Sequence, residues 1–169
     1  MTPAYAAFTE RGLRLAEKLA ASLPGSVTRC GHGGPALAQW TAAEFVRSDA
    51  LVFVGAVGIA VRAIAPHCRS KASDPAVVVL DECGRFAVPV LSGHLGGAND
   101  LARALAAVCG AVPVITTATD AHGIFAVDEW AKHQNCTVLE AERIKHVSSK
   151  LLAGQSVRFA AEFPVQGTP

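Results

Sequence analysis

The chain is poor in the features that mark several large classes of protein. Charged residues make up 17% of its 169 residues, and 15 lysines and arginines are nearly balanced by 14 aspartates and glutamates. Nucleic-acid binding usually requires a marked basic excess, so this balance argues against a nucleic-acid partner. A disordered chain has few aliphatic residues, whereas 51% of this chain is hydrophobic although only 6% is aromatic. The composition therefore favours a folded domain with an aliphatic core.

The sequence also shows no pattern typical of a membrane-spanning segment, a secretory signal or a cysteine framework. The longest apolar runs, residues 50–61 and 104–119, are shorter than the about 20 apolar residues that a spanning helix needs. The amino terminus shows no basic segment followed by an apolar one, as a secretory signal would. The five cysteines are scattered and include no Cys-x-x-Cys pair, which argues against a disulfide framework or a zinc knuckle. We therefore expect a cytoplasmic protein with reduced thiols and no membrane partner.

Short aliphatic runs alternate with segments of helical periodicity, and this alternation predicts an α/β fold. We expect an open, mostly parallel sheet flanked by helices, with a β-hairpin that turns at residues 81–84. From about residue 128 the chain becomes more polar, and further short strands at 137–139 and 158–163 would make a second small α/β lobe. The strands of the main sheet are expected at residues 4–8, 26–29, 50–54, 76–80, 85–90 and 112–115.

Residues 92–99 form the segment richest in groups that can bind a ligand. They follow an expected strand and open an expected helix. Glycines let a backbone approach a ligand closely, and amides at the start of a helix attract anions. The predicted ligand is therefore a phosphate or carboxylate. The segment fits neither the dinucleotide fingerprint nor the P-loop, so neither of those two kinds of site is predicted. The alternative is that the glycines only permit tight packing between strand and helix. The residues concerned are Ser92, Gly93, His94, Gly96, Gly97 and Asn99.

His94 and Arg62 are the charged or titratable side chains best placed for chemistry in such loops. A histidine can transfer protons at cellular pH, although His94 could equally order its turn by hydrogen bonding. Arg62 follows the second glycine-containing loop, Gly55 to Gly58, and its planar guanidinium suits a carboxylate. The ordinary alternative for Arg62 is a surface ion pair with Asp49.

A third loop contains Thr116, Thr117 and Asp120, which could orient a substrate or position a water molecule. By themselves these residues are more typical of a turn and a helix cap. Arg85 lies at the expected hairpin tip, where a solvated turn is the default and substrate contact the alternative. The remaining histidines show no spacing of metal ligands and are interpreted as structural or exposed: His32, His67, His122, His133 and His146.

Four segments in order along the chain resemble the cobalamin biosynthesis family CbiG. They are GAVGIAVRAIAP at 55–66, SDPAVVV at 73–79, LSGHLGGAN at 91–99 and PVITTATD at 113–120. The resemblance implies a cobalt-precorrin-5A hydrolase of the anaerobic pathway. Such an enzyme opens the ring A δ-lactone of a cobalt-tetrapyrrole substrate to give cobalt-precorrin-5B and releases acetaldehyde. Because the cobalt belongs to the substrate, no cofactor and no separate metal site are expected.

Lactone opening needs an activated water and donors for the developing oxyanion. We expect His94 to be the base or acid, and the Gly96 and Gly97 amides with Asn99 to be the donors. Asp120 is the second candidate for positioning the water. A tetrapyrrole carries several carboxylates, and Arg62, Arg85 and the glycine loops are the groups expected to bind them.

The resemblance also divides the chain. Residues 1–125 would be the amino-terminal α/β domain, 126–163 a smaller α/β middle region, and 164–169 a linker to a CobE-like carboxy-terminal domain that is not in this sequence. One alternative function is a non-catalytic corrinoid-binding domain that needs that domain or a partner for turnover. Another is a nucleotide- or sugar-phosphate-binding protein, which the missing nucleotide motifs disfavour. The aliphatic excess leaves a homodimer open.

Overall fold

The computed structural model describes residues 1–70, 73–162 and 164, and the chain divides into two compact units. The first unit comprises residues 1–114 and the second begins at Ile115. The sequence places a domain boundary after residue 125, whereas the two units separate where the chain leaves the last strand of the sheet.

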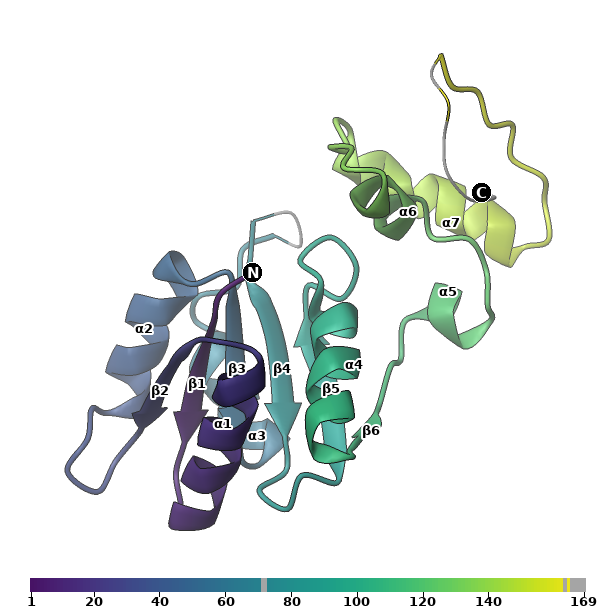
Figure 1. The fold of residues 1–169 in the computed structure, drawn as a ribbon. Coiled ribbons are helices and arrows are strands. Elements are labelled where there is room, and N and C mark those ends of the chain that lie inside the picture. The colour runs from purple at the N-terminus through teal and green to yellow at the C-terminus, as the bar shows by residue number, and fades with distance from the viewer. Residues whose placement is uncertain (71–72, 163, 165–169) are drawn as a thin grey trace. The chain divides into compact units, whose positions relative to one another are not determined.

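The first unit is built on a six-stranded sheet with the order β2-β1-β3-β4-β5-β6 (Figure 1). The first four strands are parallel, β5 runs antiparallel to β4, and β6 runs parallel to β5. This arrangement confirms the predicted open, mostly parallel α/β sheet with one hairpin. The strands are β1 (Pro3–Ala7), β2 (Ser26–Arg29), β3 (Ala50–Val54), β4 (Ala76–Leu80), β5 (Phe86–Leu91) and β6 (Val112–Pro113).

The three central strands β1, β3 and β4 are buried at every position. Their apolar sequences show no alternation because helices cover both faces of the sheet. The helices α1 (Glu10–Ser22) and α4 (Ala98–Cys109) contact each other on one face, and α2 (Leu37–Arg47) and α3 (Val57–Ile64) contact each other on the opposite face (Figure 1). In the core beneath α2, the Trp40 ring meets the Phe53 ring edge-on at 5.5 Å.

Local signals in the sequence determine where the helices begin and end. Thr9 caps α1, because its hydroxyl accepts a hydrogen bond from the Gly12 amide at 3.0 Å, and the Pro24-Gly25 pair follows its end. Gly97 and Gly110 flank α4 with φ angles of 82° and 79°, a left-handed conformation that glycine adopts without steric cost.

The second unit is helical in its described residues. It contains α5 (Ala118–Ala121), α6 (Val127–His133), the short 3-10 helix η1 (Ala141–Arg143) and α7 (Ile144–Leu152). The Trp130 ring packs near the rings of Phe125 and Phe159, with centroids 6.0 and 5.1 Å apart. These aromatic contacts and the buried side chain of Ile144 form the interior of this unit.

Three strand predictions are wrong in whole or in part. Residues 137–139 and 158–162 form no strand, and residue 163 lies outside the described part of the chain. Leu139 is 92% exposed, so it has no apolar neighbour to bury against, and a strand without a paired neighbour leaves its backbone groups to water. The strand predicted at 112–115 is only two residues long and stops at Pro113, although the Val114 amide still donates to the Ala87 carbonyl of β5 at 2.8 Å.

The five cysteines are free thiols, and Cys30 is buried. Burial raises the pKa of the Cys30 thiol. None of the helices in the described ranges combines the length and the apolar character that a membrane crossing requires.

Candidate functional site

The carboxyl ends of β1, β3 and β4 meet at one edge of the sheet and border a crevice of about 380 Å³. From β1 the chain passes through α1 to β2 on one side, and from β3 it passes through α3 to β4 on the other. Ligands of open α/β sheets bind beyond strand ends at such a reversal. The crevice is lined by Phe8, Thr9, Val54, Gly55, Ala56, Ile59, Asp81 and Glu82.

Gly55 lies in this crevice for a packing reason. A Cβ atom at position 55 would lie 2.8 Å from a carbon of the Phe8 ring, so the close approach of loop and ring requires glycine. Gly58 stands in the first turn of α3, and the Arg62 guanidinium donates to its carbonyl at 3.3 Å. Of these three predicted residues Gly55 lines the crevice, whereas Arg62 lines a neighbouring depression between α2 and α3.

Arg62 is exposed, and the ion pair with Asp49 that would explain it is not formed. The Asp49 carboxylate instead accepts from the Thr2 amide at 2.8 Å and lies 3.9 Å from the amino terminus. Arg85 stands at the other end of the hairpin turn, exposed and 3.7 Å from the Asp81 carboxylate. Both guanidinium groups are open to solvent at the edge where β3 and β4 end.

Asp81 organises the hairpin turn between β4 and β5. Burial would raise the pKa of its carboxyl group, but hydrogen bonds from the amides of Phe86, Arg85 and Cys83 outweigh that effect and lower the pKa. The neighbouring Glu82 accepts a hydrogen bond from the Thr9 hydroxyl at 2.7 Å. The hairpin tip is therefore tied to the start of α1.

The loop at residues 92–97 lies at the opposite edge of the sheet. Because β5 runs antiparallel to β4, the carboxyl end of β5 stands beside the start of β4. The Ser92 hydroxyl donates to the Asp74 carbonyl, two residues before β4, at 2.9 Å. The loop therefore follows the carboxyl end of β5 alone and not those of the parallel strands. The sheet therefore separates Ser92, Gly93, His94, Gly96, Gly97 and Asn99 from Gly55, Gly58, Arg62 and Arg85.

Hydrogen bonds within the 92–97 loop use several of the backbone groups predicted to face a ligand. The Gly97 amide donates to the His94 carbonyl at 2.9 Å, and the Asn99 amide donates to the Gly93 carbonyl at 3.0 Å. A Cβ atom at Gly96 would lie 2.4 Å from the Ser92 Cβ. The glycines thus allow the loop to fold back on itself, as the packing alternative requires, and their role as ligand donors stays a prediction.

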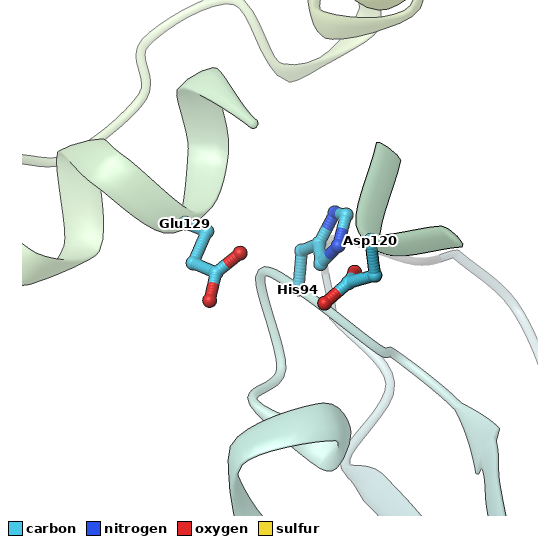
Figure 2. Close-up of side chains that lie close together, drawn as sticks. All are labelled: His94, Asp120 and Glu129. Atoms are coloured by element: carbon cyan, nitrogen blue, oxygen red, sulfur yellow. The ribbon is translucent and has the colours of Figure 1, made fainter. Parts of the chain in front are cut away.

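His94, Asp120 and Glu129 come from three different elements, which Figure 2 shows. His94 belongs to the first unit and is half-buried in the loop before α4, whereas Asp120 on α5 and Glu129 on α6 belong to the second unit. Thr117 precedes α5, and its hydroxyl donates to the Asp120 carboxylate without capping a backbone amide of the helix, so the ligand and turn roles of this pair stay predictions. Thr116 is exposed in the segment before α5.

Within the second unit, the Glu129 carboxylate lies close to that of Asp120, and the sequence pattern did not single out Glu129. A carboxylate oxygen of Glu129 lies within 4.8 Å of one from Asp120, and another potential ligand atom, on His133, lies within 4.8 Å of Glu129. These oxygen and nitrogen atoms are of the kinds that bind divalent cations. The spacing of Glu129 and His133, one helical turn apart, is the signal that could have found the pair.

Comparison with known proteins identifies relatives for most of the chain. Residues 39–120 match the family model described as cobalamin synthesis G N-terminal. The cobalt-precorrin-5A hydrolase of Salmonella typhimurium is 42% identical over 160 residues, covering 88% of this chain and 45% of that protein. The enzyme of the same name from Priestia megaterium is 40% identical over 112 residues, covering 66% of this chain and 30% of that protein.

A solved structure supports the fold. The crystal structure of a cobalamin biosynthesis protein G homolog from Sulfolobus solfataricus aligns with a TM-score of 0.57 and 24% identity, covering 96% of this chain and 51% of that one. The chain thus spans about half the length of its relatives or less. The resemblance predicted from the four motifs is confirmed, and the chain carries the amino-terminal region of the cobalamin synthesis G family.

Proposed function

We propose that this chain takes part in cobalamin biosynthesis by hydrolysing the ring A δ-lactone of cobalt-precorrin-5A to cobalt-precorrin-5B, with release of acetaldehyde. The observation that carries this proposal is the 42% identity over 160 residues to a protein named cobalt-precorrin-5A hydrolase. That alignment covers nearly the whole of this chain, including the loop with His94 and the segment with Asp120.

The chemistry assigned to His94 follows from the imidazole and its loop. In lactone hydrolysis a water oxygen attacks the carbonyl carbon, the acyl carbon–oxygen bond breaks, and the leaving oxygen takes up a proton. Acetaldehyde leaves in a second step, in which the new hydroxyl loses its proton, its carbon–oxygen bond becomes a carbonyl, and the bond from that carbon to the macrocycle breaks. The macrocycle keeps the electron pair of that bond and takes up a proton. An imidazole can accept the proton of the attacking water and return one to the leaving oxygen at neutral pH. The loop holds His94 between the end of β5 and the start of α4. Asp120 is the second candidate for holding the water.

The two edges of the sheet divide the predicted binding residues into separate groups. A strand of five residues spans about 17 Å, so a single carboxylate cannot contact both edges. We assign the reaction to the edge that carries His94 and retain Arg62 and Arg85 as carboxylate ligands at the opposite edge. Cobalt enters with the substrate, so no resident cofactor is required.

The compartment and the partner also remain proposals. Free thiols suit the reducing cytoplasm, which we keep as the location. A CobE-like domain is the partner that the family resemblance implies, and adding it to the assay tests whether turnover depends on it.

The experiment that tests the function is incubation of the purified chain with cobalt-precorrin-5A and measurement of acetaldehyde by its enzymatic reduction with NADH. We expect acetaldehyde from the wild-type chain and a rate that falls about 10²-fold or more in His94→Ala, the typical effect of losing a general acid–base group. His32→Ala is the matched control, because His32 lies in an exposed loop at residues 31–34.

Two outcomes would contradict the proposal in different ways. Undiminished acetaldehyde release by His94→Ala would remove His94 from the reaction. A change in the substrate's absorption spectrum without any acetaldehyde from the wild-type chain would replace the hydrolase with the corrinoid-binding domain as the function.

A further inference from the structure

Ser92 has a backbone conformation that its residue type rarely adopts. Its φ angle is +56°, in the left-handed region, and its side chain is only 9% exposed. Among the described residues, the other non-glycine positions with positive φ are His32 and Asn135, which are both exposed. Histidine and asparagine are enriched in this region, but a buried serine is not. Contacts around Ser92 must therefore hold it in place.

The Ser92 side chain is anchored on the segment that precedes β4. Its hydroxyl donates a hydrogen bond to the Asp74 carbonyl at 2.9 Å, and both residues are buried. The Asp74 carboxylate in turn accepts hydrogen bonds from the amides of Arg69, at 2.9 and 3.1 Å, and of Ser70, at 3.1 Å. Asp74 thus fixes the backbone that supplies the acceptor for Ser92.

The rest of the loop is built on Ser92. Its carbonyl accepts from the Ala98 amide at 3.1 Å, at the first residue of α4. On its other side, Gly96 approaches so closely that a Cβ there would lie 2.4 Å from the Ser92 Cβ. His94 lies between these two contacts, and its carbonyl accepts from the Gly97 amide. A shift of Ser92 would therefore move the backbone that carries His94.

From this chain of contacts we propose that Asp74 and Ser92 are positioning residues for His94, and that Ser92 acts through the Asp74 carbonyl and not by touching the substrate. This inference rests on the proposed function only for its catalytic consequence. Its structural part, the dependence of the His94 loop on the hydroxyl of Ser92, is measurable in the chain without substrate.

The first test is amide hydrogen exchange in Ser92→Ala. We expect the Gly97 and Asn99 amides, which donate within the loop, to exchange about tenfold faster than in the wild-type chain, because local opening is easier. The Gly55 amide, which donates to the Leu80 carbonyl at the opposite edge, should keep its wild-type rate. Unchanged exchange at Gly97 and Asn99 would overturn the proposal.

Two further variants distinguish the loss of the Ser92 hydrogen bond from two other effects. These are the change in backbone strain at Ser92 and the loss of an exposed serine hydroxyl. Ser92→Gly removes the hydroxyl and relaxes the positive φ angle, so it should fold well and still exchange faster in the loop. Ser22→Ala is the matched control, since Ser22 is exposed at the end of α1 and should not affect the loop. Wild-type exchange in Ser92→Gly would show that the hydroxyl is not the anchor.

The second test is turnover of cobalt-precorrin-5A by the same variants and by Asp74→Asn. Loss of positioning lowers kcat by about tenfold and leaves KM within about twofold, whereas loss of a substrate contact raises KM. A raised KM with unchanged kcat would therefore overturn the proposal. If the wild-type chain shows no turnover, the proposed function fails, and the exchange measurement still decides whether Ser92 holds the loop.

Discussion

Tyr5 is the only tyrosine in the chain, and its side chain is fully buried. Its hydroxyl donates a hydrogen bond to the Leu23 carbonyl at 2.8 Å, just after α1. Burial disfavours the charged phenolate and raises the pKa of Tyr5 to about 12. A single side chain therefore reports on the packing of β1 against the end of α1.

The ultraviolet absorbance of phenolate should titrate with a midpoint of about 12 in the folded chain and near the ordinary 10 in denaturant. Because the folded state holds the proton more tightly, the free energy of unfolding is unaffected below pH 10. It falls as the pH rises from about 10 to 12. Tyr5→Phe should remove that part of the pH dependence. A folded-state midpoint near 10, read quickly after a pH jump, would contradict the burial of Tyr5.

At the scale of single elements, Thr9 connects the start of α1 to the hairpin. Its hydroxyl oxygen accepts from the Gly12 amide at 3.0 Å, and its hydroxyl hydrogen is donated to Glu82 at 2.7 Å. Thr9→Ala should lower the free energy of unfolding by about 0.5–2 kcal/mol, the usual range for loss of an N-cap. Urea denaturation measures the change.

Thr9→Ser is the control, because serine retains both hydrogen-bonding functions of the hydroxyl. It should stay close to the wild-type stability. Equal stability of the wild-type chain and Thr9→Ala would mean that neither hydrogen bond contributes to folding.

The sequence predicts best those elements whose burial can be inferred from the local pattern of apolar residues. The unbroken apolar run at residues 50–54 is typical of a strand covered on both faces, and β3 has these bounds. The strands predicted at 137–139 and 158–163 failed because pairing depends on a neighbour that local sequence does not reveal. Leu139 follows the β-forming residues Thr137 and Val138, yet the described part of the chain brings no strand beside it.

The sequence indicated individual candidate residues of the site, but it did not show how these residues are arranged in space. The turn at residues 81–84 predicts a hairpin, and a hairpin reverses β5. Only the full sheet order shows that His94 and Arg62 then lie at opposite edges. The role of Asp74 was also hidden, because its contact with Ser92 joins residues 18 positions apart through a buried hydrogen bond. Such pairings follow from tertiary structure and leave no short-range signature.

At the scale of the whole molecule, the first unit contains the complete sheet and both of its helical layers. A fragment comprising residues 1–114 should therefore fold by itself, since its core strands β1, β3 and β4 and their covering helices are all present. Circular dichroism should show a cooperative thermal transition for this fragment. A non-cooperative melt would show that the second unit is needed to complete the fold.

The central claim is that His94 acts in the hydrolysis of cobalt-precorrin-5A, and acetaldehyde release tests it most directly. The wild-type chain and His32→Ala should release acetaldehyde at similar rates. His94→Ala should be slower by about 10²-fold or more while still changing the absorption spectrum of the substrate on binding. Equal rates of acetaldehyde release from the wild-type chain and His94→Ala would contradict the claim.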